Sequence, residues 1–186
     1  MPVQIGAKAH NFSDPTGLLS DCHRRIEMFL QSLERVASVI DRPLTDETGT
    51  ALESALRYFR DAAPKHTADE EESLFPRLRE IHLSSVEAAI ERLDALEQDH
   101  LLAEALHLEV EQLGQRYLAA GNLDCTGVES FRKAIASLVS IYKQHIGVED
   151  ELVFPLAARL LSSAEKAAIA DEMAARRNLS SRGQRG

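Results

Sequence analysis

Two short blocks of the sequence carry the same arrangement of histidine and acidic residues. The first block is His-Thr-Ala-Asp-Glu-Glu-Glu-Ser-Leu-Phe-Pro at 66–76, and the second is His-Ile-Gly-Val-Glu-Asp-Glu-Leu-Val-Phe-Pro at 145–155. Residues four apart on an α-helix lie one above the other, so each block presents an imidazole and a carboxylate toward a common point. Such a pair is suited to binding a metal ion.

The His-x-x-x-Glu spacing alone is a weak signal, because it also occurs at 23/27, 100/104 and 107/111. At about 100° per residue, the direction of each side chain can be compared with the apolar stripe of its own helix. Both members of each repeated block fall within about 30° of the stripe centre. We therefore predict that four side chains point inward: His66, Glu70, His145 and Glu149.

The other two long helices contribute one inward histidine each. His23 and His100 lie on the inner flank of their helices, whereas Glu27 and Glu104 lie roughly 110° from the stripe centre. We expect these two glutamates to be solvated. The sequence thus directs four imidazoles and two carboxylates toward the bundle axis.

This set of groups predicts a metal centre. Burying a carboxylate without compensation costs several kcal/mol, so two of them beside four imidazoles make sense mainly around cations. A mixed imidazole and carboxylate set without thiolate suits iron, manganese or zinc, and six ligands are too many for one tetrahedral zinc ion. Two metals fit better, since each glutamate can bridge and two histidines can serve each metal. Open coordination positions could then bind dioxygen, peroxide or a small anion.

The elements that position these residues are helices. Apolar residues recur at helical spacing over about 16–40, after a possible cap at Asp14-Pro15, and over about 46–80, after a possible cap at Thr45. Pro64 should kink the second helix, and Pro76 should disturb its last turn. A third helix is expected from Ser84 or Ser85 to about 118, ending before Gly121-Asn122.

A fourth helix is predicted from about 126 to 160, with an inner stripe that reaches Leu152 and with Pro155 near its end. Ser162-Ser163-Ala164-Glu165 resembles a capping box and predicts a short helix over about 163–176. No strand alternation appears. We therefore expect an all-α fold, an up-down-up-down four-helix bundle with a short additional C-terminal helix. Residues 1–13 form a lead, 14–176 the domain, and 177–186 a flexible tail.

Composition excludes several classes of function. The chain of 186 residues is 44% hydrophobic and carries a net charge of −9, which gives no electrostatic footprint for nucleic acid or an anionic membrane. No window approaches the roughly 20 apolar residues of a membrane span, and the first residues contain no apolar core long enough for a signal peptide, so we expect neither feature. We expect a cytoplasmic protein with no nucleic-acid or membrane partner. Cys22 and Cys125 are expected to be buried or half-buried thiols without a disulfide.

The sequence resembles the hemerythrin family, specifically hemerythrin-like (HHE cation-binding) proteins with the ligand pattern H, HxxxE, H, HxxxE. The match covers about residues 14–160, with metal ligands at His23, His66, Glu70, His100, His145 and Glu149. The resemblance implies two iron ions in an oxygen-bridged di-iron centre that binds dioxygen or reacts with hydrogen peroxide or nitric oxide.

The pattern departs from that of oxygen-carrying hemerythrins. Their third helix supplies HxxxH, whereas this chain has Glu104 at the second position. Their fourth helix supplies HxxxxD, a spacing that Asp150 matches although it points away from the apolar stripe. These departures weigh against simple reversible oxygen storage.

Other polar residues of the helices are assigned simpler roles. We interpret His107 as a hydrogen-bonded core histidine and Tyr142 as a packing residue, although a role for Tyr142 behind the metal ligands stays open. Glu71, Glu72, Asp150 and Glu151 are expected to form a solvated acidic face.

Three hypotheses follow for function. The first is a di-iron protein acting on dioxygen or peroxide with catalase-like turnover, and the second is a module that senses oxygen, nitric oxide or iron through a partner. The third, a helical bundle without metal, is disfavoured by the repeated blocks. Since the chain shows no motif for an organic substrate, we expect small inorganic ligands to be its only direct reactants.

Overall fold

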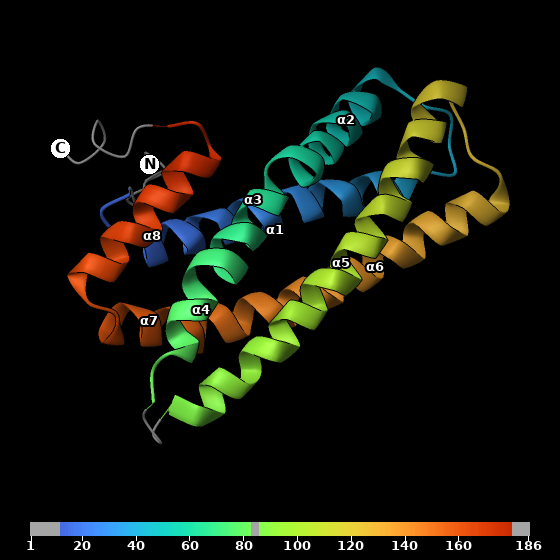
Figure 1. The fold of residues 1–186 in the computed structure, drawn as a ribbon. Helices are drawn as coiled ribbons and strands as arrows, with labels where there is room; N and C mark the ends of the chain where they lie inside the picture. The colour runs from blue at the N-terminus through green and yellow to red at the C-terminus, as the bar shows by residue number, and fades with distance from the viewer. Residues whose placement is uncertain (1–11, 83–85, 180–186) are drawn as a thin grey trace, which may run out of the picture.

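The computed structural model, which describes residues 12–82 and 86–179, is a bundle of helices (Figure 1). Its long helices are α1 (Pro15–Val39), α2 (Asp46–Asp61), α5 (Glu87–Ala120) and α6 (Cys125–Val148). Both α2 and α6 pack against α1 and against α5, so these helices close around a shared interior. The described residues contain no strand. The all-α prediction is confirmed, and the helices alternate in direction along the chain as expected (Figure 1).

Side-chain caps fix where most of these helices begin. The amide of Gly17 donates to Asp14 at 3.0 Å, and the amide of Thr48 donates to Thr45 at 3.2 Å. These two caps were predicted. Asp124 accepts from the amide of Gly127 at 2.7 Å, so α6 starts at Cys125, slightly before the expected position. The predicted caps of the third helix, Ser84 and Ser85, lie outside the described residues.

The second and fourth helical stretches each contain a widened, π-helical turn. The second continues beyond a break at Ala62 as α3 (Ala63–Ala68), the π-turn η1 (Asp69–Leu74) and α4 (Phe75–Arg79). The fourth continues from α6 as η3 (Glu149–Val153) and α7 (Phe154–Leu160). In each turn the phenylalanine amide donates to the carbonyl five residues earlier, at Glu70 or Glu149.

The Phe-Pro pair that ends each repeated block accounts for the position of these turns. Pro76 and Pro155 lack an amide hydrogen and crowd the carbonyl four residues earlier, which opens the regular hydrogen-bond ladder. The extra residue then rotates the following side chains by about 100°. Leu152, predicted to face inward, is consequently 40% exposed, while Val153 and Phe154 are buried.

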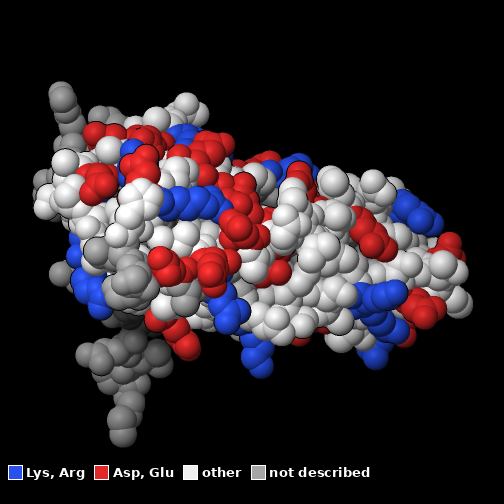
Figure 2. Space-filling model, turned by 60° about the horizontal axis from the view of Figure 1, so that its bottom comes forward, with Lys and Arg blue, Asp and Glu red and all other residues white. Residues whose placement is uncertain are grey.

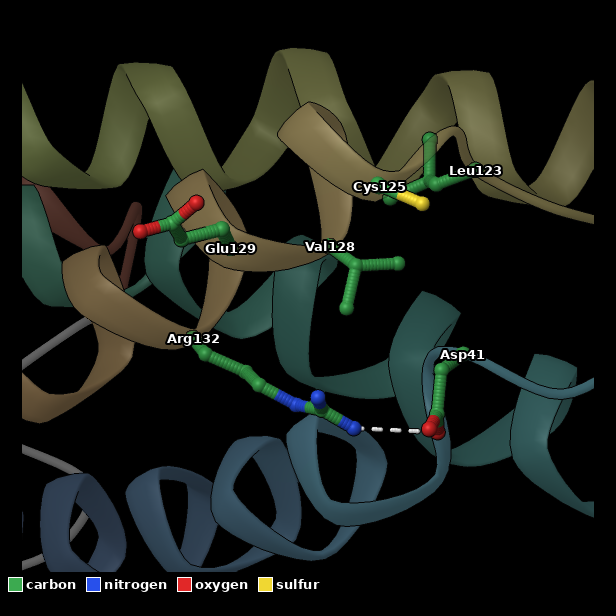
Figure 3. A pocket seen from close by; sticks show the side chains of 6 residues that line it. All are labelled: Asp41, Leu123, Cys125, Val128, Glu129 and Arg132. Atoms are coloured by element: carbon green, nitrogen blue, oxygen red, sulfur yellow. Dashed lines mark ion pairs between the residues drawn. The ribbon is translucent and has the colours of Figure 1, made fainter.

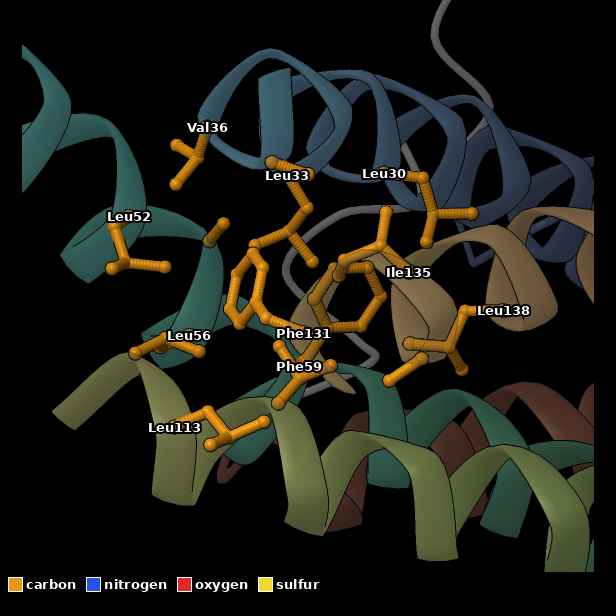
Figure 4. Packing of buried hydrophobic residues seen from close by; sticks show 14 of the residues in the cluster. Leu30, Leu33, Val36, Leu52, Leu56, Phe59, Leu113, Phe131, Ile135 and Leu138 are labelled. Carbon is orange, nitrogen blue, oxygen red and sulfur yellow. The ribbon is translucent and has the colours of Figure 1, made fainter. Parts of the chain in front are cut away.

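Apolar clusters lie on both sides of the polar layer in the described part of the bundle. One cluster joins leucines of α1, α2, α5 and α6 around Phe59 and Phe131 (Figure 4). Another joins α1, α4, α5 and α7 to α8 (Ser163–Arg176) and contains Phe75 and Phe154. Along α1, Leu19 belongs to the second cluster and Ile26 to the first, with His23 between them. The polar groups are therefore enclosed between two apolar regions.

The short C-terminal helix α8 was predicted with its bounds and its cap. Ser162 accepts from the amide of Glu165, whose carboxylate accepts from the amide of Ser162. The expected flexible tail was wrong at its first residue, because Arg177 is half-buried and donates to Asp69 at 2.6 Å. Residues 180–186, and most of the predicted N-terminal lead, lie outside the described residues.

Acidic side chains dominate part of the surface. Figure 2 shows them gathered toward the end of the molecule where α7 and α8 lie, in keeping with the net charge of −9. Across residues 12–82 and 86–179, no helix combines the length and the hydrophobicity that a membrane crossing would require.

Gly121 and Gly147, at the ends of α5 and α6, give opposite predictions for stability. Gly121 has φ +76° after α5, a conformation that disfavours any side chain, so Gly121→Ala should lower the free energy of unfolding by about 1 kcal/mol. Gly147 is helical, and a Cβ there would meet no atom within 4 Å, so Gly147→Ala should raise it by about 0.5–1 kcal/mol. Urea denaturation followed by circular dichroism checks both signs, and a shift of equal sign in both variants would contradict this account.

Candidate metal centre

The structure brings all six predicted ligand residues together between the two apolar clusters. His23 comes from α1, His66 from α3, His100 from α5 and His145 from α6. Glu70 is the second residue of η1 and Glu149 is the first of η3, and each lies one turn after the histidine of its own block. Both glutamates are fully buried, with 0% exposure, although glutamate is among the residues least often found inside proteins.

The ligand atoms form two overlapping groups. One group consists of His23, His66, Glu70 and Glu149, and the other consists of Glu70, His100, His145 and Glu149, each with its ligand atoms within 4.8 Å of one another. Both glutamates belong to both groups. The sharing follows from the fold, because each carboxylate lies between one histidine pair and the other.

The Nε2 atoms of the four imidazoles all point at these carboxylates. Nε2 of His66 lies 3.1 Å from Glu70, and Nε2 of His145 lies 3.1 Å from Glu149. From the other two helices, Nε2 of His23 lies 3.0 Å from Glu149 and Nε2 of His100 lies 3.4 Å from Glu70. The Nε2 atoms of His100 and His145 lie only 3.0 Å apart.

These contacts leave buried acceptors unsatisfied. All four carboxylate oxygens of Glu70 and Glu149, and Nε2 of His23, are buried without a well-formed hydrogen bond in the described structure. A buried oxygen without a partner is costly, and a buried carboxylate more so. Lone pairs converging on a common point are suited to a cation, so the residues present fit a metal centre.

A carboxylate behind two of the histidines fixes the orientation of the ring. Asp150 lies 3.1 Å from Nδ1 of His23, and Glu71 lies 2.7 Å from Nδ1 of His100. A carboxylate only accepts, so the ring must donate from Nδ1, which leaves Nε2 free to bind a metal. Ser20 donates to Asp150 at 2.7 Å and holds it in place.

This arrangement corrects the predicted solvated acidic face. Glu71 and Asp150 are half-buried and contact histidines, whereas Glu72 and Glu151 are exposed as expected. The regular 100° step directed Glu71 and Asp150 outward, toward solvent. Each nevertheless reaches Nδ1 of a histidine on a neighbouring helix. The sequence did contain a signal for these contacts, since an acidic residue directly follows the ligand glutamate in both blocks.

The phenylalanine that closes each block packs on a histidine of another helix. Phe154 stacks on His23 with ring centroids 5.1 Å apart, and Phe75 lies parallel to His100 at 6.4 Å. Each block therefore supplies its own pair of ligand candidates. It also supplies a carboxylate and an aromatic ring that contact a histidine on a different helix. These rings exclude water from the imidazoles they cover.

The electrostatics of the site favour proton binding where the metal would bind. Burial opposes the charge on His23, but the neighbouring carboxylates of Asp150, Glu149 and Glu70 raise its pKa to about 12. Burial likewise opposes the charge on His100, and Glu70 and Glu71 raise its pKa to about 9. Burial dominates at His66 and lowers its pKa to about 4. For Glu70, the surrounding imidazoles outweigh burial and hold the pKa well below its usual range.

A buried aspartate next to Glu70 was not foreseen. Asp69 is 0% exposed and accepts from Arg176 at 3.0 Å and from Arg177 at 2.6 Å. These contacts join η1 to the end of α8. Burial raises the pKa of Asp69 and the two guanidinium groups counteract it. Sequence reasoning had no signal for this pair, because the partners lie more than 100 positions apart.

The remaining predictions about polar residues hold. Glu27 and Glu104 are exposed and belong to neither ligand group. His107 is a hydrogen-bonded histidine, with Nε2 3.0 Å from the hydroxyl of Tyr142. The ring of Tyr142 packs near Phe59 and lies edge-on to the ligand candidate His145, with centroids 6.4 Å apart in each pair, while its hydroxyl contacts His107.

Comparison with known proteins agrees with the geometry. A family model described as the hemerythrin HHE cation binding domain matches residues 14–175. An uncharacterized protein from Haemophilus influenzae is similar to this chain, with 27% identity over 173 residues that cover 90% of this chain and 92% of that protein.

The direction of each glutamate predicts which variants lose metal. Glu70→Ala and Glu149→Ala should each remove a ligand from both groups and lower bound metal at least tenfold, whereas Glu27→Ala and Glu104→Ala should bind as the wild type does. Metal analysis after dialysis against a weak chelator measures the difference. Loss of metal in Glu104→Ala with retention in Glu149→Ala would contradict the assignment.

The raised pKa values of His23 and His100 predict proton release on metal binding. Both exceed 7, so both rings are protonated at pH 7 without metal, and each must lose a proton to bind one. Loading should therefore release at least about two protons per chain at pH 7, and affinity should rise with pH. Calorimetry in buffers of different ionisation enthalpy counts the protons. Release of fewer than about one would show that the imidazoles are already neutral.

Proposed function

This chain belongs to the hemerythrin HHE cation-binding family, and we propose that it is a non-haem di-iron protein that binds and reacts with dioxygen or hydrogen peroxide. The two iron ions would be bridged by oxygen and by the carboxylates of Glu70 and Glu149. His23 and His66 would hold one ion, and His100 and His145 the other. Nitric oxide is a further small ligand that such a pair could bind.

The observation that carries this proposal is the sharing of both glutamates by the two ligand groups. A single metal would need one group of donors, whereas here each group contains two imidazoles of its own. Imidazole and carboxylate donors without thiolate suit iron, as the family match also favours. Protein donors then occupy only part of each coordination sphere.

The residues around the ligands would control the reactivity of the centre. Bound iron would supply redox capacity and open positions for small oxygen species. Asp150 and Glu71 orient His23 and His100 and make them stronger donors. Phe75 and Phe154 keep water from the rings they cover.

The ligand set favours reaction over reversible oxygen storage. Oxygen-carrying hemerythrins have a further histidine where this chain has Glu104. The side chain of Glu104 is exposed. Asp150, which has the spacing of their aspartate, faces Nδ1 of His23 instead of joining a ligand group. With one protein ligand fewer, the centre would leave more room for exchangeable solvent and for peroxide.

Purified protein loaded with iron tests the proposal. We expect about two iron atoms per chain, an absorption band from oxide bound to ferric iron, oxygen release on addition of hydrogen peroxide, and rapid autoxidation. Glu149→Ala should lose the band and the oxygen release, and Glu104→Ala should keep both. A reproducible content of one zinc atom, or a stable and fully reversible oxygen complex without peroxide breakdown, would contradict the proposal.

A further inference from the structure

A cavity of about 420 Å³ opens beside the metal centre, between α2–α3 and α5. His100 and Glu71 are among its lining residues, and so are exposed leucines of α5. This volume is within the range of sites that hold small organic molecules. No sequence pattern indicates such a cavity, because its walls come from separate helices.

The walls are mainly apolar. Leu56, Phe59, Ala63, Ala103 and Val110 line the interior and are buried. At the mouth, Leu101 and Leu108 also line the cavity and are each 59% exposed. Leucines exposed to this extent at a cavity mouth favour a ligand with an apolar body.

The cavity also contains an aromatic face with a hydrogen-bonding group. The ring of His107 stacks on Phe59 with centroids 4.2 Å apart, and its Nε2 lies 3.0 Å from the hydroxyl of Tyr142. The second ring nitrogen, Nδ1, hydrogen-bonds to no residue in the described part of the chain. Burial lowers the pKa of His107 to about 4, so the ring is neutral and can accept or donate one hydrogen bond.

Charge at the cavity disfavours an anion. Its lining includes Glu71, Glu104 and Glu111 but only one guanidinium, that of Arg60, which pairs with Glu111 at 2.8 Å. A negatively charged ligand would meet an excess of carboxylates in a partly desolvated space. Arg60 is already engaged and offers little compensation.

A different cavity of about 430 Å³, at the start of α6, lacks these features (Figure 3). It contains the exposed thiol of Cys125, which was expected to be at least half-buried, and the ion pair of Arg132 with Asp41 at 2.9 Å. That pair satisfies its own charges, and no candidate metal ligand lines the space.

We propose that the cavity beside the metal centre binds an uncharged, hydroxyl-bearing aromatic molecule of one or two rings. The ring would pack between Phe59 and the leucines of α5, and the hydroxyl would hydrogen-bond to Nδ1 of His107. Such a ligand would lie against His100 and Glu71. Because side chains alone form the cavity, binding requires no metal and stands apart from the reactivity proposed above.

Three probes of similar shape test the class of ligand by calorimetry on the full chain, with and without metal. 2-Naphthol should bind once per chain with a Kd on the order of 10–100 µM. Naphthalene, which lacks the hydroxyl, should bind about 3- to 10-fold more weakly. Naphthalene-2-sulfonate should bind at least about tenfold more weakly than 2-naphthol, because it is an anion.

Variants then locate the site. His107→Phe should reduce the affinity for 2-naphthol to that for naphthalene and leave naphthalene binding unchanged. Leu108→Asp at the mouth should weaken both probes. The matched control is Leu102→Asp, since Leu102 is 56% exposed on the same helix but does not line the cavity. Ala103→Phe, which fills the interior, should abolish binding of both.

Two results would overturn the proposal. One is the absence of 2-naphthol binding to wild-type protein whose circular dichroism shows intact helices. The other is equal binding of all three probes without any effect of His107→Phe or Leu108→Asp. Either result would leave the di-iron proposal intact, because metal content and peroxide breakdown are measured without an organic ligand.

Discussion

Two carboxylates buried without hydrogen bonds are the constraint on which the rest of the structure depends. Glu70 and Glu149 have no exposed surface, and their oxygens lie beside imidazoles without a hydrogen bond. Their charge is tolerable in a helical core only if positive charge is brought to the same point. The fold meets this requirement with one histidine from each long helical stretch, and it encloses the whole polar layer between apolar clusters. A bound cation would supply that charge, in keeping with the match of the chain to a cation-binding family.

Each of the two repeated blocks also supports a ligand candidate that lies on another helix. In each, the residue after the ligand glutamate orients a histidine on another helix, and the closing phenylalanine packs on that same histidine. This is possible because a π-turn places one more residue in the turn after the glutamate than an α-helix would. The Phe-Pro pair is thus as much a part of the site as the ligands are.

Most of the fold, and the positions of the six ligand candidates, could be predicted because both depend on local periodicity. Caps at Asp14, Thr45 and Ser162 fixed helix starts, and a 100° step distinguished Glu70 from Glu104. The wrong direction assigned to Leu152 has a local cause, because a π-turn changes the phase of the helix. Contacts between distant segments, such as that of Asp69 with Arg177, and the cavity beside His100 depend on tertiary packing. No periodic pattern encodes them.

The pairing of Asp69 with two arginines makes the halves of the site unequal. The position that corresponds to Asp69 in the second block is Val148, which carries no charge and needs no counterion. The two blocks are therefore alike in the groups that face the centre. They differ in that only the first, through Asp69, pairs with the arginines at the end of α8. A shortened chain that ended before α8 would keep every ligand candidate yet leave one half with an uncompensated buried anion. The smallest self-sufficient unit of this domain accordingly extends to Arg177, beyond the four-helix bundle itself.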